Sequence, residues 1–208
     1  MNPWGKRSYI SNIEVREEGG TPGILQAVKA GMCFQLKEEM GIKRITLRER
    51  ELLNLLTIEL SRISGLGIMG IENTNRIGAL SFYTERIHHH LFAKVLNDQF
   101  AVQVRSGCFC AGVYGHYLLN IGNEESKKIA NEIENSEFYK KLGWVRISIH
   151  PTMKNSEMIY IANAIKTIVE NIDRIKGEYV YHNETDEFIH KSWFKNRNRL
   201  KVLLWSMI

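Results

Sequence analysis

The sequence predicts an α+β fold of two layers, in which helices pack on one face of a short-stranded sheet. Helical apolar periodicity recurs along the chain, and short segments with strand-like alternation lie between the helices. Hydrophobic residues make up 44% and charged residues 25% of the 208 residues, which is ordinary for a globular domain. We therefore expect one compact domain, or one domain with appendages, with a sheet of three or four strands.

The N-terminal part of the chain predicts a strap followed by a helix. Residues 1–18 are polar and lack a 3.6-residue period, so we expect irregular structure there. In the turn that follows, Thr21 is placed to cap a helix and Pro22 to occupy its first turn. Gly41 is placed to end this helix. Its apolar face carries Leu25, Val28, Met32 and Leu36.

Helices and short strands then alternate through the middle of the chain. Apolar stripes predict four helices, at residues 46–63, 86–97, 113–121 and 123–135. Runs of β-branched and aromatic residues, bounded by turn residues, predict three strands, at residues 67–72, 76–83 and 101–105.

The C-terminal part begins with the clearest strand of the chain. Residues 144–149 alternate between apolar side chains on one face and polar or aromatic ones on the other. Asn155 is expected to cap a long apolar helix that Gly177 ends. Residues 178–190 are expected to form a small hairpin, and no clear structure is predicted after Trp193.

Composition and charge exclude several classes of protein. The formal net charge is +5, but the charges are interspersed, so we expect no nucleic-acid partner. No apolar run approaches the roughly 20 residues of a membrane span, and the N-terminus lacks the apolar core of a secretory signal. Three cysteines at uneven spacing make no disulfide framework, so we expect a reduced, cytoplasmic setting.

The strongest candidate for chemistry is the stretch 101–117, in which a β-branched run ends in Arg105 and a glycine-bounded turn follows. Cys110 in that turn is a candidate nucleophile, because a nearby cation lowers the pKa of a thiol. The alternative is a small buried hydrophobic side chain, which is the commonest fate of a free cysteine.

A zinc site is another interpretation of the same turn. Cys108, Cys110 and His116 supply three soft ligands, although structural zinc sites usually use wider spacings than Cys-x-Cys. The run 88–90 is three histidines, but adjacent residues of a helix point about 100° apart. We therefore expect these histidines to cap a helix or face solvent, and we expect no metal.

Two further positions suit the binding of an anion. Arg146 lies in the middle of the strand 144–149, where its planar guanidinium can hold a carboxylate in two places or form a structural salt bridge. Gly20 and Thr21 precede a helix, whose free N–H groups form an anion site or are simply capped. The residues alone leave both alternatives open.

Three segments together resemble the C-terminal part of the pyridoxal-phosphate-dependent proteins with the class V aminotransferase fold. In order, they are Gly19-Gly20-Thr21-Pro22, VRSGCFCAG at 104–112, and WVRIS at 144–148. The branch that they resemble contains the cysteine desulfurases and selenocysteine lyases. The resemblance covers residues 14–176, and it implies the small C-terminal domain of a fold-type I enzyme.

The resemblance implies a role for each matching residue. Cys110 falls on the cysteine that attacks the substrate's sulfur or selenium and carries it as a persulfide or its equivalent. Arg146 falls on the arginine that binds the substrate's α-carboxylate, and Arg105 falls on a second active-site arginine. Gly20 and Thr21 fall on a segment that reaches across a homodimer to the cofactor phosphate of the other subunit.

The sequence also departs from the family's pattern. In the family a lysine upstream of the glycine–threonine segment holds pyridoxal phosphate as a Schiff base, but 19 residues precede Gly20, and Lys6 lacks the His-Lys context. His190-Lys191 lies downstream of the cysteine turn, in the wrong order. We therefore expect a fragment, a truncated gene product or a separated domain, which is inactive alone.

A second departure concerns the substrate. Cys108 and Phe109 precede Cys110, where the family often has histidine or glutamine, so the amino-acid substrate need not be cysteine. The expected domains are a strap and cross-dimer segment at 1–22, the class V C-terminal domain at 23–190 and a tail at 191–208. Two alternatives to a desulfurase stay open: an aminotransferase or lyase without a nucleophilic cysteine, and a non-catalytic module that docks onto a full-length homologue.

Overall fold

The structure is a computed structural model that describes residues 4–5, 7–73, 75–107, 112–135, 139 and 142–193. The chain divides into two compact units, Met1–Ile45 and Thr46–Ile208. The boundaries expected for the strap, the domain and the tail stay a prediction.

The first unit contains the short helix α1 (Ile13–Glu17), the long helix α2 (Ile24–Met40) and the start of α3 (Ile42–Ser61). The prediction of irregular structure before residue 19 is wrong for α1, because the Asn12 side chain accepts a hydrogen bond from the N–H of Val15 and caps it. The N-cap of α2 is Gly23, which makes no side-chain hydrogen bond. The prediction that Thr21 caps this helix is therefore wrong.

The apolar stripe predicted for α2 exists but is exposed. No described residue of the first unit is buried, and the exposed fraction of the stripe residues runs from 54% to 74%. The stripe residues are Leu25, Val28, Met32 and Leu36. The periodicity therefore predicts the helix correctly, whereas the unit itself offers no side chains to cover its apolar face.

The second unit is built on a four-stranded antiparallel sheet in the order β1-β2-β4-β3. Its strands are β1 (Gly67–Ile68), β2 (Ala79–Tyr83), β3 (Arg105–Gly107) and β4 (Trp144–Ser148). In register, β4 places Ile147 opposite Leu80 of β2, and Val145 opposite Ser106 of β3. The predicted sheet of three or four strands is confirmed.

Three strands are shorter than predicted: the strand predicted at 76–83 begins at Ala79, and the other two change for local reasons. The predicted strand 67–72 ends at Ile68, because the Arg76 guanidinium donates to the backbone carbonyls of Met69, Gly70 and Asn73. The described residues 69–73, 75 and 76 form a loop instead, which we call the Arg76 loop. The predicted strand 101–105 begins only at Arg105. Residue 101 instead ends the preceding helix in the left-handed region, with φ of 53°.

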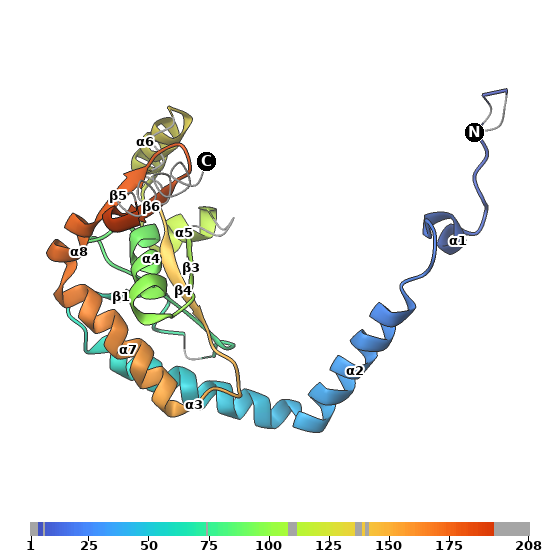
Figure 1. Ribbon diagram of the computed structural model, residues 1–208, viewed down its shortest axis with the longest axis horizontal. Coiled ribbons are helices and arrows are strands. Elements are labelled where there is room, and N and C mark those ends of the chain that lie inside the picture. The colour runs from blue at the N-terminus through green and yellow to red at the C-terminus, as the bar shows by residue number, and fades with distance from the viewer. Residues whose placement is uncertain are drawn as a thin grey trace, which may run out of the picture. The chain divides into compact units, whose positions relative to one another are not determined.

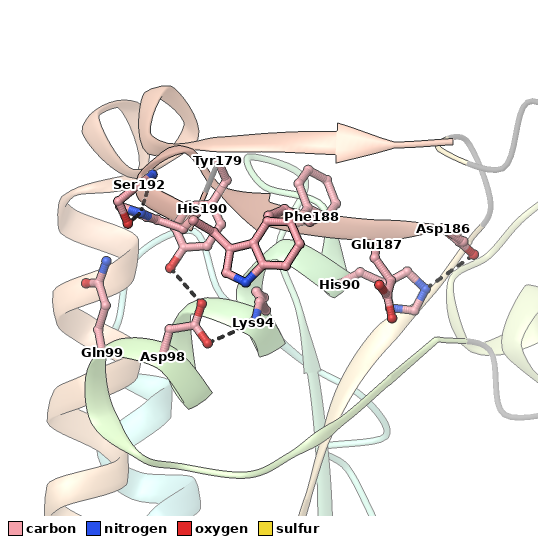
Figure 2. Close-up of a pocket in the computed structure, with 12 residues that line it drawn as sticks. His90, Lys94, Asp98, Gln99, Tyr179, Asp186, Glu187, Phe188, His190 and Ser192 are labelled. Atoms are coloured by element: carbon pink, nitrogen blue, oxygen red, sulfur yellow. Dashed lines mark hydrogen bonds and ion pairs between the residues drawn. The ribbon is translucent and has the colours of Figure 1, made fainter. Parts of the chain in front are cut away.

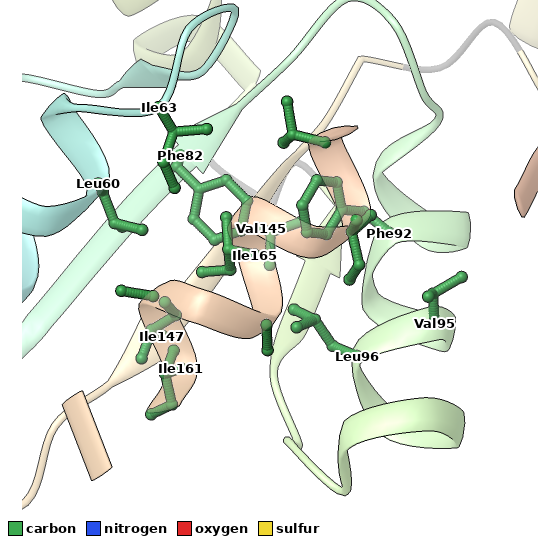
Figure 3. Close-up of a cluster of buried hydrophobic side chains, with 14 of the residues drawn as sticks. Leu60, Ile63, Phe82, Phe92, Val95, Leu96, Val145, Ile147, Ile161 and Ile165 are labelled. Carbon is green, nitrogen blue, oxygen red and sulfur yellow. The ribbon is translucent and has the colours of Figure 1, made fainter. Parts of the chain in front are cut away.

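Helices α3, α4 (His89–Phe100) and α7 (Asn155–Glu170) cover one face of this sheet (Figure 1). They form the core with the apolar faces of β2 and β4, as Figure 3 shows for Phe82, Val145 and Ile147 among the helix side chains. Phe82 is fully buried and meets Phe92 edge to face, with 5.2 Å between the ring centroids.

The long helix predicted over 155–176 is two helices, α7 and α8 (Ile172–Glu178), which meet at Asn171. The N-cap of α7 is Lys154 rather than Asn155, and its N–H donates to the Glu157 carboxylate at 2.7 Å. The predicted hairpin is confirmed as β5 (Tyr179–His182) and β6 (Glu187–His190).

Two further helices complete the second unit, α5 (Gly112–Leu118) and α6 (Asn123–Glu134). α5 contacts the sheet through Gly115, which lies against Trp144. Because Trp144 alternates with the core residue Val145 along β4, this contact is on the opposite face from the core. No helix within the described ranges is long and apolar enough to cross a membrane.

Candidate functional site

The face of the sheet turned away from the core carries a row of polar side chains. Arg146 of β4 lies opposite Ser81 of β2 on one side and opposite Arg105 of β3 on the other. Side chains directly opposite in an antiparallel pair share a face, with about 5 Å between their Cβ atoms. The fold therefore brings together the two arginines that the sequence singles out, and adds a hydroxyl beside them.

Arg146 lines a pocket of about 440 Å³ next to this row of polar side chains. Its lining comes from the sheet, from α5 and from the Arg76 loop. The lining residues are Met69, Gly70, Glu72, Asn73, Arg76, Ala79, Ser81, Tyr114, Leu118, Trp144 and Arg146. Arg146 is half-buried and Arg105, on the edge strand β3, is exposed.

Trp144 fixes the position of α5 against this face. A Cβ atom at Gly115 would lie 2.7 Å from two ring carbons of Trp144, so only glycine allows the helix to approach this closely. Trp144 is 6% exposed. The ring also borders an apolar crevice of about 210 Å³ between α5 and α6, which Gly115 lines as well.

The cysteine turn lies outside the described residues, including Cys108 and Cys110. The residues on either side of the turn are described. Gly107 ends β3 opposite Trp144, and Gly112 begins α5, whose Tyr114 lines the Arg146 pocket. The turn therefore starts and ends at elements that form this site.

The segment with Gly20 and Thr21 belongs to the first unit. Gly20 has φ of 112°, a conformation that glycine adopts readily and other residues rarely do. Helix α2 follows without a side-chain cap. A flexible glycine, an exposed hydroxyl and the uncapped start of a 17-residue helix fit a phosphate, because free N–H groups and the helix dipole favour an anion there.

The three consecutive histidines have separate roles. His88 is the N-cap of α4, and its Nδ1 accepts from the N–H of His90 at 3.2 Å. Burial, followed by the charge of His90, lowers the pKa of His88 from 6.5 to about 4. His89 is buried, so the expectation of capping is confirmed for His88 and that of solvent exposure is wrong for His89.

The other zinc candidate, His116, has its Nδ1 3.1 Å from the Ser126 hydroxyl. Within the described part of the chain no group of three histidines, cysteines or carboxylates is placed to hold a metal ion. The two cysteines of the proposed set lie outside that part, so the expectation of no metal stays a prediction.

A larger pocket of about 820 Å³ lies elsewhere, between α4 and the hairpin β5–β6 (Figure 2). The Asp98 carboxylate accepts from Lys94 at 3.0 Å and from the Tyr179 hydroxyl at 3.3 Å. His90 Nε2 lies 3.7 Å from the Asp186 carboxylate on the pocket side, and its Nδ1 lies 2.8 Å from the Ser106 hydroxyl. None of the predicted site residues that the structure describes lines this pocket.

Sequence reasoning missed the walls of the Arg146 pocket. The sequence predicts strand for most of the Arg76 loop, and it gives Ser81 no role, although strand alternation from Ala79 to Tyr83 places Ser81 on the open face. The hydrogen bond between the His90 ring and the Ser106 hydroxyl joins α4 to β3, and no local sequence pattern predicts such a contact.

Comparison with known proteins gives a consistent result. The family model described as aminotransferase class V matches residues 6–160. A probable cysteine desulfurase of Xylella fastidiosa (strain Temecula1) is 38% identical over 94 residues, which is 45% of this chain and 22% of that protein. Probable cysteine desulfurase 2 of Mycobacterium leprae is 36% identical over 97 residues, 46% of this chain and 23% of that protein.

Solved structures show the same fold. The apo structure of a cysteine desulfurase from Thermococcus onnurineus NA1 matches with a TM-score of 0.56 and 24% identity, over 75% of this chain and 34% of that one. A cysteine desulfurase from Escherichia coli, in an S-sulfonic acid form, matches with a TM-score of 0.54 and 19% identity, over 74% and 32%. The chain thus spans less than a quarter of these two curated relatives and about a third of the solved structures.

Proposed function

The chain belongs to the class V aminotransferase family, and on that premise we propose that it is the substrate-binding and sulfur-accepting part of a pyridoxal-phosphate-dependent cysteine desulfurase. Its fold is the predicted one, the α+β small domain of fold-type I enzymes. The observation that carries the proposal is the pairing of Arg105 with Arg146 across β3 and β4, next to the ends of the cysteine turn. Selenocysteine is the alternative substrate.

In this proposal Arg146 binds the α-carboxylate of the substrate. Its guanidinium can make two parallel hydrogen bonds to a carboxylate, which fixes orientation as well as charge. The Ser81 hydroxyl, next in the row, is placed to support the same group. The half-burial of Arg146 in a pocket strengthens such a contact relative to one on an open surface.

Cys110 is the proposed sulfur acceptor. Its thiolate attacks the sulfur of the substrate, an S–S bond forms, and the carbon–sulfur bond breaks with its electron pair left on carbon. Arg105 lies five residues before Cys110 in the sequence, and its positive charge favours the thiolate over the thiol. Cys108 has no part in this scheme.

Pyridoxal phosphate fits the residues present only in part. When bound, it supplies the electron sink for the carbon that loses its sulfur. Gly20 and Thr21 would hold its phosphate, across a homodimer, and the Schiff-base lysine is not assigned to any residue of this chain. We propose a cytoplasmic location for the protein. Its activity would depend on a cofactor-binding part outside these 208 residues.

One observation favours a second function, that of a module docked onto a full-length homologue. The exposed apolar stripe of α2 is a surface that such docking would cover. Size-exclusion chromatography with and without a homologue separates the two functions, since a docking module shifts to a larger complex.

Turnover of L-cysteine by the full-length protein with pyridoxal phosphate tests the proposed reaction. We expect Cys110→Ala to lose sulfur transfer to a thiol acceptor, and Cys108→Ala, two residues away in the same turn, to keep it. Unchanged turnover in Cys110→Ala would instead support an aminotransferase or lyase of the same fold without a nucleophilic cysteine.

A further inference from the structure

We propose that Asp186, in the turn of the hairpin β5–β6, is a positioning residue for the edge strand β3 of the proposed site, and that it acts through the His90 ring and the Ser106 hydroxyl. This inference rests on the proposed function in one respect, namely that β3 belongs to the substrate site. The hairpin lies beyond residue 160, where the match to the class V family model ends, so it is a part of the chain that the match does not cover.

The register of the sheet places the Ser106 side chain on the face that the helices cover. Ser106 of β3 lies opposite Val145 of β4, a core residue that is 1% exposed. Since directly opposite residues share a face, the Ser106 hydroxyl turns toward the helix layer, where it needs a hydrogen-bond partner. The His90 ring of α4 supplies one, with 2.8 Å between its Nδ1 and the hydroxyl oxygen.

The other nitrogen of the His90 ring faces the hairpin. Its Nε2 lies 3.7 Å from the Asp186 carboxylate, which is a charge contact rather than a hydrogen bond (Figure 2). A carboxylate beside Nε2 favours the tautomer that has its proton there. Nδ1 is then an acceptor, and the Ser106 hydroxyl donates to it. The ring also lies against Gly107, because a Cβ atom at that glycine would lie 3.7 Å from its Cε1.

The hairpin fixes the Asp186 carboxylate in turn. One of its oxygens accepts a hydrogen bond from the Tyr181 hydroxyl at 3.0 Å, and the other faces His90. Burial, followed by the hydrogen bond to Asp186, raises the pKa of Tyr181 to about 12, so this hydroxyl stays a donor at neutral pH. The backbone of Asp186 is in the left-handed region, with φ of 53°, which aspartate and asparagine adopt more readily than most residues.

Strand β3 is the part of the sheet that such a contact can influence most. It has three residues and lies at an edge of the sheet, paired with β4 on one side. A short edge strand belongs to the segments that open locally at low cost in free energy. A contact from α4 to the middle residue of β3 therefore affects how often the strand separates from β4, and with it the position of Arg105.

Asp186→Asn tests the inference, because asparagine keeps the turn conformation and an oxygen for Tyr181 but removes the charge beside His90. Hydrogen exchange of the backbone amides, followed by NMR in the ¹⁵N-labelled chain, measures how often β3 and β4 separate. We expect exchange in this strand pair to become about threefold faster, which is the effect of losing one partly exposed charge contact. Amides of β1 and β2, at the other edge of the sheet, should keep their rates.

Two further variants separate this route from general effects of charge and stability. Glu187→Gln removes the same charge from the next residue of the hairpin, which is exposed and lines the same pocket, so exchange in β3 and β4 should not change. Ser106→Ala removes the hydroxyl that His90 contacts, and adding Asp186→Asn to it should cause no further change. An Asp186 that merely stabilises the hairpin would change the rates by the same factor in both backgrounds. Retained peak dispersion in the spectra shows that each variant folds.

Turnover of L-cysteine by the full-length protein then tests the effect on the site. We expect Asp186→Asn to lower kcat/KM about threefold, in line with the exchange rates, and Glu187→Gln to leave it unchanged.

The outcomes distinguish this inference from the proposed function. Equal exchange in the wild type and Asp186→Asn, or the same change with and without the Ser106 hydroxyl, overturns the positioning role. Unchanged turnover of an active protein in Asp186→Asn overturns its effect on the site. A full-length protein that does not consume L-cysteine overturns the proposed function, while the exchange rates still decide whether Asp186 positions β3.

Discussion

Adding one methyl group to Gly115 should loosen the contact between α5 and the sheet. The new Cβ atom would lie 2.7 Å from Cη2 and Cζ3 of Trp144, so this ring, which is 6% exposed, would have to move out of its packed position toward one of the two pockets that it borders. Alanine gains up to about 1 kcal/mol over glycine in helix propensity. Forcing an extra methyl group into a close contact costs about 1–3 kcal/mol, so we expect a net loss of about 1 kcal/mol.

Gly112 provides a matched control in the same helix. A Cβ atom there meets no heavy atom within 4 Å, so Gly112→Ala should keep the propensity gain without the clash. Urea unfolding of both variants, followed by circular dichroism, gives the free energies, and tryptophan emission reports the displaced ring. The reasoning is refuted if Gly115→Ala is as stable as Gly112→Ala with unchanged emission.

Three further predictions concern the core and the titrating groups. Phe82→Ala should lower the free energy of unfolding by about 3–5 kcal/mol in urea, because Phe82 is fully buried; a loss below 1 kcal/mol would contradict the described core. The pKa of His88 is lowered to about 4, so the folded chain binds fewer protons than the unfolded chain and stability should fall from pH 6.5 toward 4. His88→Asn keeps a capping acceptor, so urea titrations of this variant should show a weaker dependence of the unfolding free energy on pH. An unchanged pH dependence would contradict the lowered pKa of His88. Burial, followed by the charge of Asp98, raises the pKa of Tyr179 to about 12, so stability should fall between pH 10 and 12, and Tyr179→Phe should remove that loss.

The sequence predicts those elements whose pattern is set by the core. Strand β4 alternates as predicted, with Val145 and Ile147 buried, and the hairpin β5–β6 forms where turn residues separate two strand-like runs. The resemblance to class V proteins is confirmed as well. In each case the signal is local periodicity or a short motif, which a single chain displays directly.

The errors arise where one side chain or cap overrides the local pattern. Arg76 folds the predicted strand 67–72 into a loop by binding its carbonyls, and Ala101 ends α4 with a left-handed residue where a strand was expected. The pairing of Arg105 with Arg146 depends on strand order and register across 41 residues of sequence, which no local pattern specifies. The roles of Cys110, Arg105, Arg146, Gly20 and Thr21 stay predictions.

The most direct test of the account is to find where the sulfur goes. The full-length protein is incubated with pyridoxal phosphate and L-cysteine, alkylated and digested, and the peptide that follows Arg105 is sequenced by tandem mass spectrometry. The account predicts one added sulfur atom on Cys110, lost in Arg146→Gln. Added sulfur on Cys108 instead, or on neither cysteine while L-cysteine is consumed, would contradict the account.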